Sequence, residues 1–244
     1  MTPASKSVAV RTVVLAALVV AGMAVVALLP GRRAASPGPA GPALAGNHAF
    51  SDDDLRAAIA ADTLADADLL LSAFYWDRGY AAARVERRGE HIAIDEGPLF
   101  HLGAVTVTGA FGVASVLPGD VFSRRRIADD RERLTTWYQD RGFAYVNVLP
   151  ISRIDTERRT IDLTFEIEPG KRARFERVTI AGNLRVPQAA IRHAFGVAAG
   201  QPFSASALVA GKRRVMGLGL HTVDVATLRG SSDELVVVRV EVTE

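Results

Sequence analysis

The residue types that could bind a metal or activate a substrate are few and scattered. The five histidines do not pair at a spacing suited to a metal, and the chain has no cysteine, so no zinc or thiolate site is expected. The run Asp52-Asp53-Asp54 lacks the spacing of a calcium loop and fits acids that offset a helix macrodipole better. Neither a G-x-S-x-G elbow nor a phosphate-binding G-x-x-x-x-G-K-[ST] loop occurs. The sequence therefore predicts a non-enzymatic protein with no catalytic, cofactor-binding or metal-binding residues; the scattered histidines are His48, His91, His101, His193 and His221.

Three basic clusters could instead bind an anionic partner: Arg124-Arg125-Arg126, Lys171-Arg172 with Arg174, and Lys212-Arg213-Arg214. Nucleic-acid binding would favour a basic stripe with interleaved aromatic residues. Acidic residues closely follow the first cluster, and the net charge is only +2. A solvated helix face explains the clusters best, and a docking surface for an acidic partner or lipid headgroups is the alternative. No nucleic-acid partner is expected.

The chain around the first basic cluster sets the pattern for the rest. Apolar residues recur at helical spacing over residues 124–141, and Ser123 is the expected N-cap of that helix. Gly142 ends the helix, and residues 143–149 are expected to form a strand. Residues 160–167 alternate apolar and polar side chains, which is typical of a sheet with one buried and one solvated face.

The same pattern occurs on both sides of this stretch. Four upstream residues match four residues within it at equal spacing: Leu71, Tyr75, Gly79 and Tyr80 match Leu134, Tyr138, Gly142 and Phe143. Downstream, the run Gly119-Asp120-Val121-Phe122-Ser123 reappears as Gly200-Gln201-Pro202-Phe203-Ser204. An internal repeat of about seventy residues predicts modules in tandem.

The repeat follows an apolar N-terminal segment. Residues 1–30 contain an uninterrupted apolar run of about eighteen residues, long enough to cross a bilayer, and are expected to be a retained signal anchor. Cleavage near Ala43-Leu44-Ala45 is the alternative, and residues 31–47, rich in Pro, Gly and Ala, are expected to be a flexible linker. The first unit lacks an evident first strand and is expected to be incomplete, and the second has little room for a first helix. The three expected units are 48–99, 100–171 and 172–244.

The strand-helix-helix-strand-strand order of the third unit, with its motifs, resembles the POTRA domain of the Omp85 proteins, such as BamA and TamA. The residues that carry the resemblance are Phe175, Val178, Ile180, Gly182 and Asn183, then Gly200, Phe203 and Ser204, then Val215, Gly219, Leu220, Val223 and Val225. In the second unit they are Leu134, Tyr138, Gly142 and Phe143, then Ile167-Glu168-Pro169-Gly170. The expected fold class is therefore α+β. A transmembrane helix precedes tandem β-α-α-β-β domains, and each domain has a three-stranded mixed sheet with helices on one face.

The resemblance also sets the expected function. Omp85 proteins end in a membrane-inserted β-barrel, which this chain is expected to lack, so insertase activity is not carried over. The resemblance implies a docking or chaperone-like module in outer-membrane protein assembly or protein translocation, with periplasmic domains anchored in the inner membrane or secreted after cleavage of the anchor. Expected partners are unfolded or extended outer-membrane or secreted polypeptides, and a separately encoded β-barrel is a candidate. A structural protein of the cell-division complex, of the FtsQ type, is the alternative.

The client-binding surface is expected to be backbone rather than side chain. In POTRA-like sheets the strand after the second helix lies at an edge, where unpaired amides and carbonyls can accept an extended client as an extra strand. The alternative is that neighbouring units cover these edges. The residues expected to form the two client-binding edges are Phe143, Tyr145, Val146, Val148, Leu220, Val223 and Val225.

Overall fold

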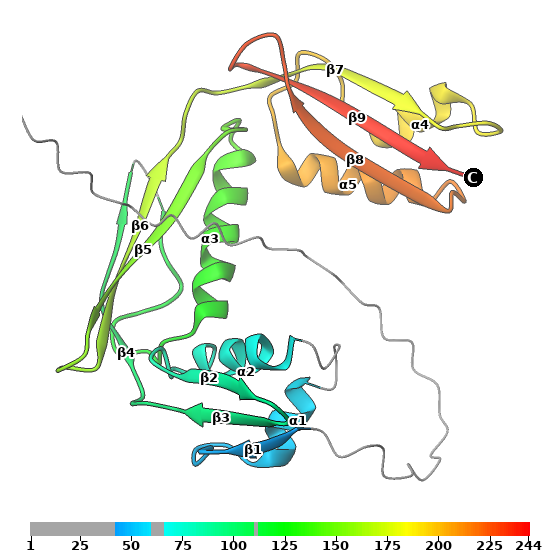
Figure 1. Ribbon diagram of the computed structural model, residues 1–244. Helices are drawn as coiled ribbons and strands as arrows, with labels where there is room; N and C mark the ends of the chain where they lie inside the picture. The colour runs from blue at the N-terminus through cyan, green and yellow to red at the C-terminus, as the bar shows by residue number, and fades with distance from the viewer. Residues whose placement is uncertain (1–41, 60–65, 110–111) are drawn as a thin grey trace, which may run out of the picture. The chain divides into compact units, whose positions relative to one another are not determined.

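The computed structural model describes residues 42–59, 66–109 and 112–244 (Figure 1). These residues form three small modules in tandem, each with its own three-stranded sheet and its own hydrophobic core. The expected N-terminal anchor at 1–30 lies outside the described residues. Within the described part, no helix combines the length and the apolar character needed to span a bilayer.

Each sheet places the last strand of its module in the middle. In every sheet this central strand pairs in parallel with the first strand and antiparallel with the other neighbour. The tandem mixed sheets of the expected α+β fold are thus confirmed. In spatial order the sheets are β1 (Ala43–Ala45), β3 (His91–Asp95) and β2 (Arg84–Arg88); β4 (His101–Thr108), β6 (Thr160–Glu168) and β5 (Asn147–Asp155); and β7 (Arg174–Ala181), β9 (Leu235–Thr243) and β8 (Thr222–Arg229).

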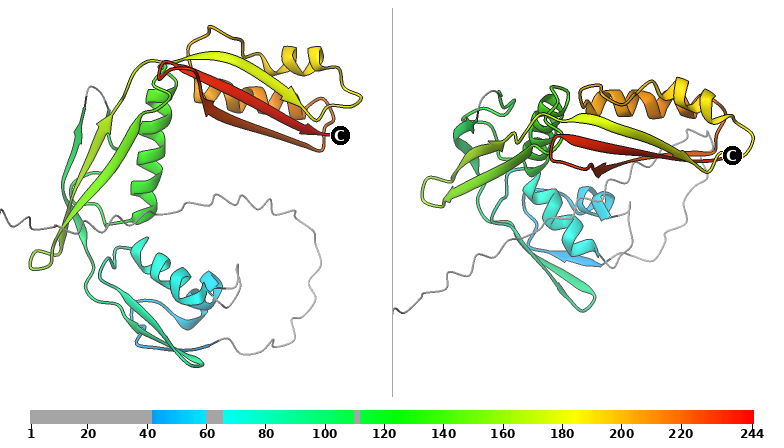
Figure 2. Two further views of the ribbon diagram at one scale, coloured as in Figure 1. Left: turned by 45° about the horizontal axis from the view of Figure 1, so that its top comes forward. Right: turned by 90° about the horizontal axis from the view of Figure 1, so that it is seen from above.

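The helices supply the other half of each core. In the third module both helices lie on the same face of the sheet (Figure 2), and Ile191 and Phe195 share one core with Val238 and Val240 of the central strand. The expected N-cap is confirmed, because the Ser123 hydroxyl accepts a hydrogen bond from the Arg126 amide at 3.3 Å. The helices are α1 (Asp52–Ile59) and α2 (Ala67–Trp76) in the first module, α3 (Arg124–Gln139) in the second, and α4 (Gln188–Phe195) and α5 (Ala205–Met216) in the third.

The second module has a single helix within its described residues, and a buried carboxylate organises the segment that precedes it. Ala114 and Val116 of this irregular segment are buried in the module core. Asp130 of α3 is only 1% exposed and accepts hydrogen bonds from the amides of Ser115 and Val116. The irregular segment therefore completes the core of the second module on this side, and the Asp130 side chain of α3 holds it in place.

The first module differs from the expected organisation. The stretch 31–47, expected to be a linker, contains β1, which pairs in parallel with β3 from Ala43 with His91 to Ala45 with Ala93. The module therefore has a first strand, contrary to the expectation. A strand of three small or aliphatic residues carries no alternating pattern, so nothing in the sequence marked it.

The strand expected at 143–149 is also wrong in its bounds. β5 begins at Asn147 and runs to Asp155. Before it, the chain turns immediately after α3, and the Val146 amide donates to the Phe143 carbonyl at 3.3 Å. The side chains of this turn are apolar because they pack against the core, so the composition of the turn resembles that of a strand.

In the first and third modules a glutamate at the end of the central strand holds the loop after the first strand. Glu96 accepts hydrogen bonds from the amides of His48 and Ala49, both at 2.9 Å. Because the first and central strands are parallel, they end at the same side of the sheet, which brings the carboxylate to this loop. Glu244 does the same in the third module for the amides of Leu184, Arg185 and Val186.

Candidate functional site

The first strands of the second and third modules lie at sheet edges, but other segments cover their beginnings. The Leu102 amide in β4 donates to the Asp120 carbonyl at 2.7 Å. The Phe175 amide in β7 donates to the Gln201 carbonyl at 2.9 Å. An incoming strand cannot pair where these groups are already bonded. The covering segments are the two repeated runs, 119–123 and 200–204.

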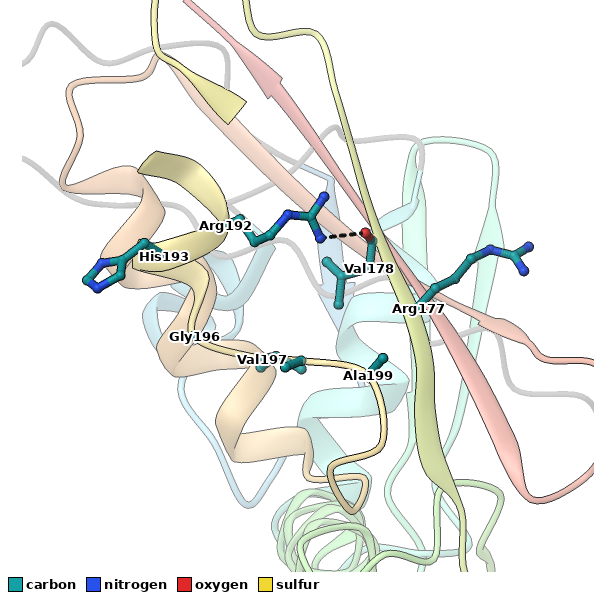
Figure 3. Close-up of a pocket in the computed structure, with 8 residues that line it drawn as sticks. Arg177, Val178, Arg192, His193, Gly196, Val197 and Ala199 are labelled. Carbon is teal, nitrogen blue, oxygen red and sulfur yellow. Dashed lines mark hydrogen bonds between the residues drawn. The ribbon is translucent and has the colours of Figure 1, made fainter. Parts of the chain in front are cut away.

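Helix α4 covers a further part of the β7 edge (Figure 3). Arg192 Nη1 donates to the Val178 carbonyl at 3.1 Å. Figure 3 shows Arg192 reaching from the helix to the strand, whereas Arg177 and His193 point away from this contact. The hollow beside it, of about 430 Å³, has a largely apolar lining. A carbonyl already bonded to a guanidinium is not available to an added strand, so the β7 edge is partly occupied.

The strand after the last helix of each module lies at a less obstructed edge. In the ranges that the structure describes, β2, β5 and β8 form ladder hydrogen bonds only with the central strand of their own sheet. Four of the five residues of β2 are Arg or Glu, and charge on an edge strand disfavours pairing with another chain. Two edges therefore remain as candidates, β5 and β8.

Strand β5 has the more apolar of the two edges. Leu149, Ile151 and Ile154 are 44%, 47% and 53% exposed. In β8 the corresponding large apolar exposed residue is Leu228, at 45%. An open edge with exposed apolar side chains on its strand is suited to the addition of another strand.

Pro150 shows which backbone groups of β5 face the open edge. It lies opposite Phe165 in the β6 ladder but has no amide hydrogen, so its nitrogen faces away from β6. Backbone groups alternate along a strand, so Val148, Ser152 and Ile154 also direct their amides to the open edge. The open edge of β5 therefore offers three backbone amide donors, at Val148, Ser152 and Ile154, and lacks one at Pro150.

The structure separates the seven residues expected to form the client-binding edges. Only Val148, Val223 and Val225 lie on edge strands, and their side chains are buried or half-buried, so they could contribute backbone only. Leu220 is buried two residues before the start of β8. The other three lie in the turn before β5: Phe143 and Val146 pack against the second core, and the Tyr145 hydroxyl donates to the Leu235 carbonyl of the third module at 2.8 Å.

Three exposed apolar residues of β5 were not among the expected client-binding residues: Leu149, which lay in the strand expected at 143–149, and Ile151 and Ile154, which lay beyond it. Pro150 stands among them and was consistent with the end of a strand, because proline in a strand is tolerated only where its nitrogen faces away from the ladder. The strand expected at 160–167 could have indicated them. In a hairpin the preceding strand has about the same length, so it would extend through residues 149–154.

Among the described residues, the titratable groups that could form a site are clusters able to hold a cation and carboxylates with shifted pKa values. Across 42–59, 66–109 and 112–244, no three His, Asp or Glu side chains come together as a cation site. Burial raises the pKa of the Asp130 and Asp140 carboxyls, but hydrogen bonds from serine hydroxyls and backbone amides outweigh it, so both pKa values lie below the usual range. Both carboxylates are engaged by the protein itself, which marks them as structural.

Two curated relatives are similar to much of this chain. The outer membrane protein assembly factor BamA of Neorickettsia risticii (strain Illinois) is 26% identical over 168 residues, which is 62% of this chain and 23% of that protein. BamA of Neisseria meningitidis serogroup B is 24% identical over 187 residues, 66% of this chain and again 23% of the relative. The chain thus spans less than a quarter of the length of these relatives.

Solved structures share the fold. Domains POTRA3-5 of Haemophilus influenzae BamA superpose with a TM-score of 0.70 at 20% identity, covering 83% of this chain and 94% of that one. BamA of Haemophilus ducreyi lacking POTRA domains 1-3 gives a TM-score of 0.51 at 18% identity, with 59% and 29% covered. At these identities the likeness establishes the fold alone.

The family model named POTRA, described as a surface antigen variable number repeat, matches residues 112–170 and 173–244. The two matches together cover more than half of the chain; the first lies within the second module, after β4, and the second spans the third module. With three β-sheet modules in tandem and sequence similarity to BamA, the chain belongs to the POTRA family and is a POTRA protein of the Omp85/BamA type.

Proposed function

We propose that this chain is a non-enzymatic docking module in outer-membrane protein assembly. It would act on the periplasmic side of the cell envelope and bind extended client polypeptides at the edge of β5. The observation that carries the proposal is the β5 edge itself, with outward amides and exposed apolar side chains on a strand that, among the described residues, pairs on one side only.

The chemistry of this edge defines the client. Main-chain pairing supplies affinity with little demand on sequence, which suits many different clients. The exposed Leu149 and Ile151 lie on one face of β5 because they are two residues apart, and Ile154 lies on the other. A client with apolar residues at alternate positions would place them beside Leu149 and Ile151. Strands of outer-membrane β-barrels alternate in this way.

The similarity to BamA supports a second expected partner, a β-barrel. The relatives are named as outer membrane protein assembly factors, and for this chain we propose a corresponding role with a β-barrel, encoded separately or joined to it, as the recipient of the client. Of the three modules at 48–99, 100–171 and 172–244, the first of them extended to include β1, the second would present the β5 edge to the client, and the β8 edge of the third is the other candidate. The anchor at 1–30 would hold them at the inner membrane.

The proposal is tested by one proline in β5. Ser152→Pro removes an outward amide and leaves the β6 ladder intact, whereas Thr156→Pro places the same residue in the adjacent hairpin turn. The probe is a fluorescent peptide copied from a strand of an outer-membrane β-barrel, titrated against the full chain in detergent by anisotropy. Loss of one inter-strand hydrogen bond, about 1 to 1.5 kcal/mol, predicts binding weaker by about tenfold for Ser152→Pro.

The control should bind the peptide as the parent does, and both variants should keep the parent unfolding temperature. Unchanged affinity in a folded Ser152→Pro variant would rule out the β5 edge as the binding site. Accumulation of the tagged chain at the division septum, rather than around the envelope, would favour the division-complex alternative over assembly.

A further inference from the structure

A short sequence is repeated after the last helix of the first and of the second module. Asp77-Arg78-Gly79 follows α2 directly, and Asp140-Arg141-Gly142 follows α3 directly. In both cases the aspartate is the C-cap residue of its helix. A negative charge at a helix C-terminus is unfavourable for that helix, because it repels the end of the macrodipole. Each aspartate is therefore expected to stabilise a contact outside its own helix.

At the junction between the second and third modules, the aspartate contacts the start of the next helix, α5. Asp140 Oδ1 accepts hydrogen bonds from the Ser204 hydroxyl and the Ser206 amide, both at 2.9 Å, and Oδ2 accepts one from the Ser206 hydroxyl at 2.7 Å. Ser204 is the N-cap of α5. A carboxylate at this position satisfies a free amide and favours the positive end of the next helix.

The junction between the first and second modules repeats this contact. Asp77 Oδ1 accepts a hydrogen bond from the Arg125 amide in the first turn of α3 at 3.0 Å. It also lies 3.4 Å from Arg124 Nε. The contact is weaker here, because one carboxylate oxygen holds both partners, whereas both oxygens of Asp140 are engaged.

Two further contacts recur at both junctions. The glycine after each Asp-Arg pair accepts a hydrogen bond from the start of the next module: Phe100 amide to Gly79 carbonyl at 2.8 Å, and Ala173 amide to Gly142 carbonyl at 2.7 Å. The alanine two residues after each glycine, Ala81 or Ala144, packs against the core of the next module.

The arginine of each pair makes its contacts on its own helix. The Arg141 guanidinium lies 3.6 Å from the centre of the Trp137 ring, and its Nη1 donates to the Trp137 carbonyl at 3.0 Å. Arg78 and Phe74 repeat the stacking at 3.4 Å. The guanidinium is thus held on its own helix, and the carboxylate remains available to the next one.

The third module lacks the pair. At the equivalent position after α5, its chain has Gly217 and Leu218 in place of Asp and Arg. An Asp-Arg pair is therefore not a general requirement for ending the last helix of a module.

We propose that Asp77 and Asp140 are junction residues that couple each POTRA module to the next by capping the last helix of that next module, and that Asp140 makes the stiffer junction. The inference does not depend on client binding. Its test uses distance distributions between spin labels, which the absence of native cysteine makes direct.

The labels go on exposed helix residues of the full chain, one per module. A57C with R131C spans the first junction, and R131C with R213C spans the second. We expect Asp140→Ala to broaden the 131–213 distribution and leave 57–131 unchanged, and Asp77→Ala to do the reverse. Asp129→Ala, on an exposed position of the same helix, is the matched control and should change neither distribution.

Two milder variants guard against loss of the fold. Asp140→Asn keeps one acceptor oxygen, and Ser206→Ala removes one hydroxyl only, so each should broaden the 131–213 distribution less than Asp140→Ala. An unchanged 131–213 distribution in folded Asp140→Ala would overturn the proposal. Equal broadening of both distributions by either aspartate variant would do the same, since it would show general loosening and no junction-specific role.

Discussion

The Ser115 hydroxyl donates to Asp130 Oδ1 at 2.6 Å, and the Ser115 amide donates to Asp130 Oδ2 at 2.7 Å. The Val116 amide donates to the same Oδ2 at 3.0 Å, and Arg133 Nη2 lies 2.6 Å from Oδ1. This one carboxylate therefore holds the irregular segment before α3 against the core of the second module.

Asp130→Ala should destabilise the second module by about 3 kcal/mol, because it leaves the buried Val116 amide without a partner and removes several charge-assisted hydrogen bonds. The chain has two tryptophans, Trp76 in the first module and Trp137 in the second. In a Trp76→Phe background, urea unfolding followed by Trp137 fluorescence reports the second module. Asp129→Ala, at the surface, should stay within about 0.5 kcal/mol of the parent. A similar small change for Asp130→Ala would contradict the structural role.

The same carboxylate predicts a pH dependence of stability. The folded-state pKa of Asp130 lies below its ordinary value, so its contribution is fully present above the unfolded pKa of about 3.9 and is lost as the pH falls through the lower folded-state pKa. The free energy of unfolding of the second module should therefore fall with acidification below about pH 4. Asp130→Asn should show a shallower slope there. Parallel slopes for the two proteins would show that other carboxylates account for the acid sensitivity.

Gly182 is a position where glycine is required for two reasons. Its φ is +87°, and a Cβ there would collide with the Val242 carbonyl oxygen. Gly200 has φ of +83° but open space around its Cβ position. Gly182→Ala should lower the unfolding free energy of the third module by clearly more than the roughly 1 kcal/mol expected for Gly200→Ala from backbone strain alone. Hydrogen exchange of β9 amides measures both variants, and equal losses would indicate that the backbone at 182 moves to relieve the collision.

Pro150→Ala restores the missing donor on the β5 edge. Because an unbroken edge is a template for strand pairing, this variant should self-associate more than the parent and bind the barrel-strand peptide more tightly. Sedimentation velocity of the full chain in detergent measures the self-association. Pro118→Ala, in an exposed turn of the same module, is the control and should sediment as the parent does. No change in either measurement for Pro150→Ala would indicate that the β5 edge is covered in solution.

The repeat allowed the tandem sheets to be predicted, because its motifs mark positions with fixed structural roles. Ser123 and Ser204 are N-caps, and Gly142 has the positive φ of 97° that the turn after α3 requires. These requirements are local, so they are visible in sequence. The edge position of the strand after the last helix followed from the family resemblance rather than from any single residue.

The details of the edges could not be predicted, because they depend on contacts between distant residues. β1 pairs with β3 across the whole first module, and its three residues carry no pattern of their own. Asp130 stands among charged residues of α3 and becomes buried only when the segment around Ser115 folds over it. The turn at 143–146 has strand-like composition because its side chains pack inward, while β5 continues past a proline that an edge tolerates.

The glutamates at the ends of the central strands have a wider consequence. Glu96 and Glu244 each tie the far end of a first strand to the far end of a last strand, so each of these sheets is clasped at the margin where it would otherwise begin to fray. A sheet held in this way should resist fraying from that end, and its strands should separate cooperatively.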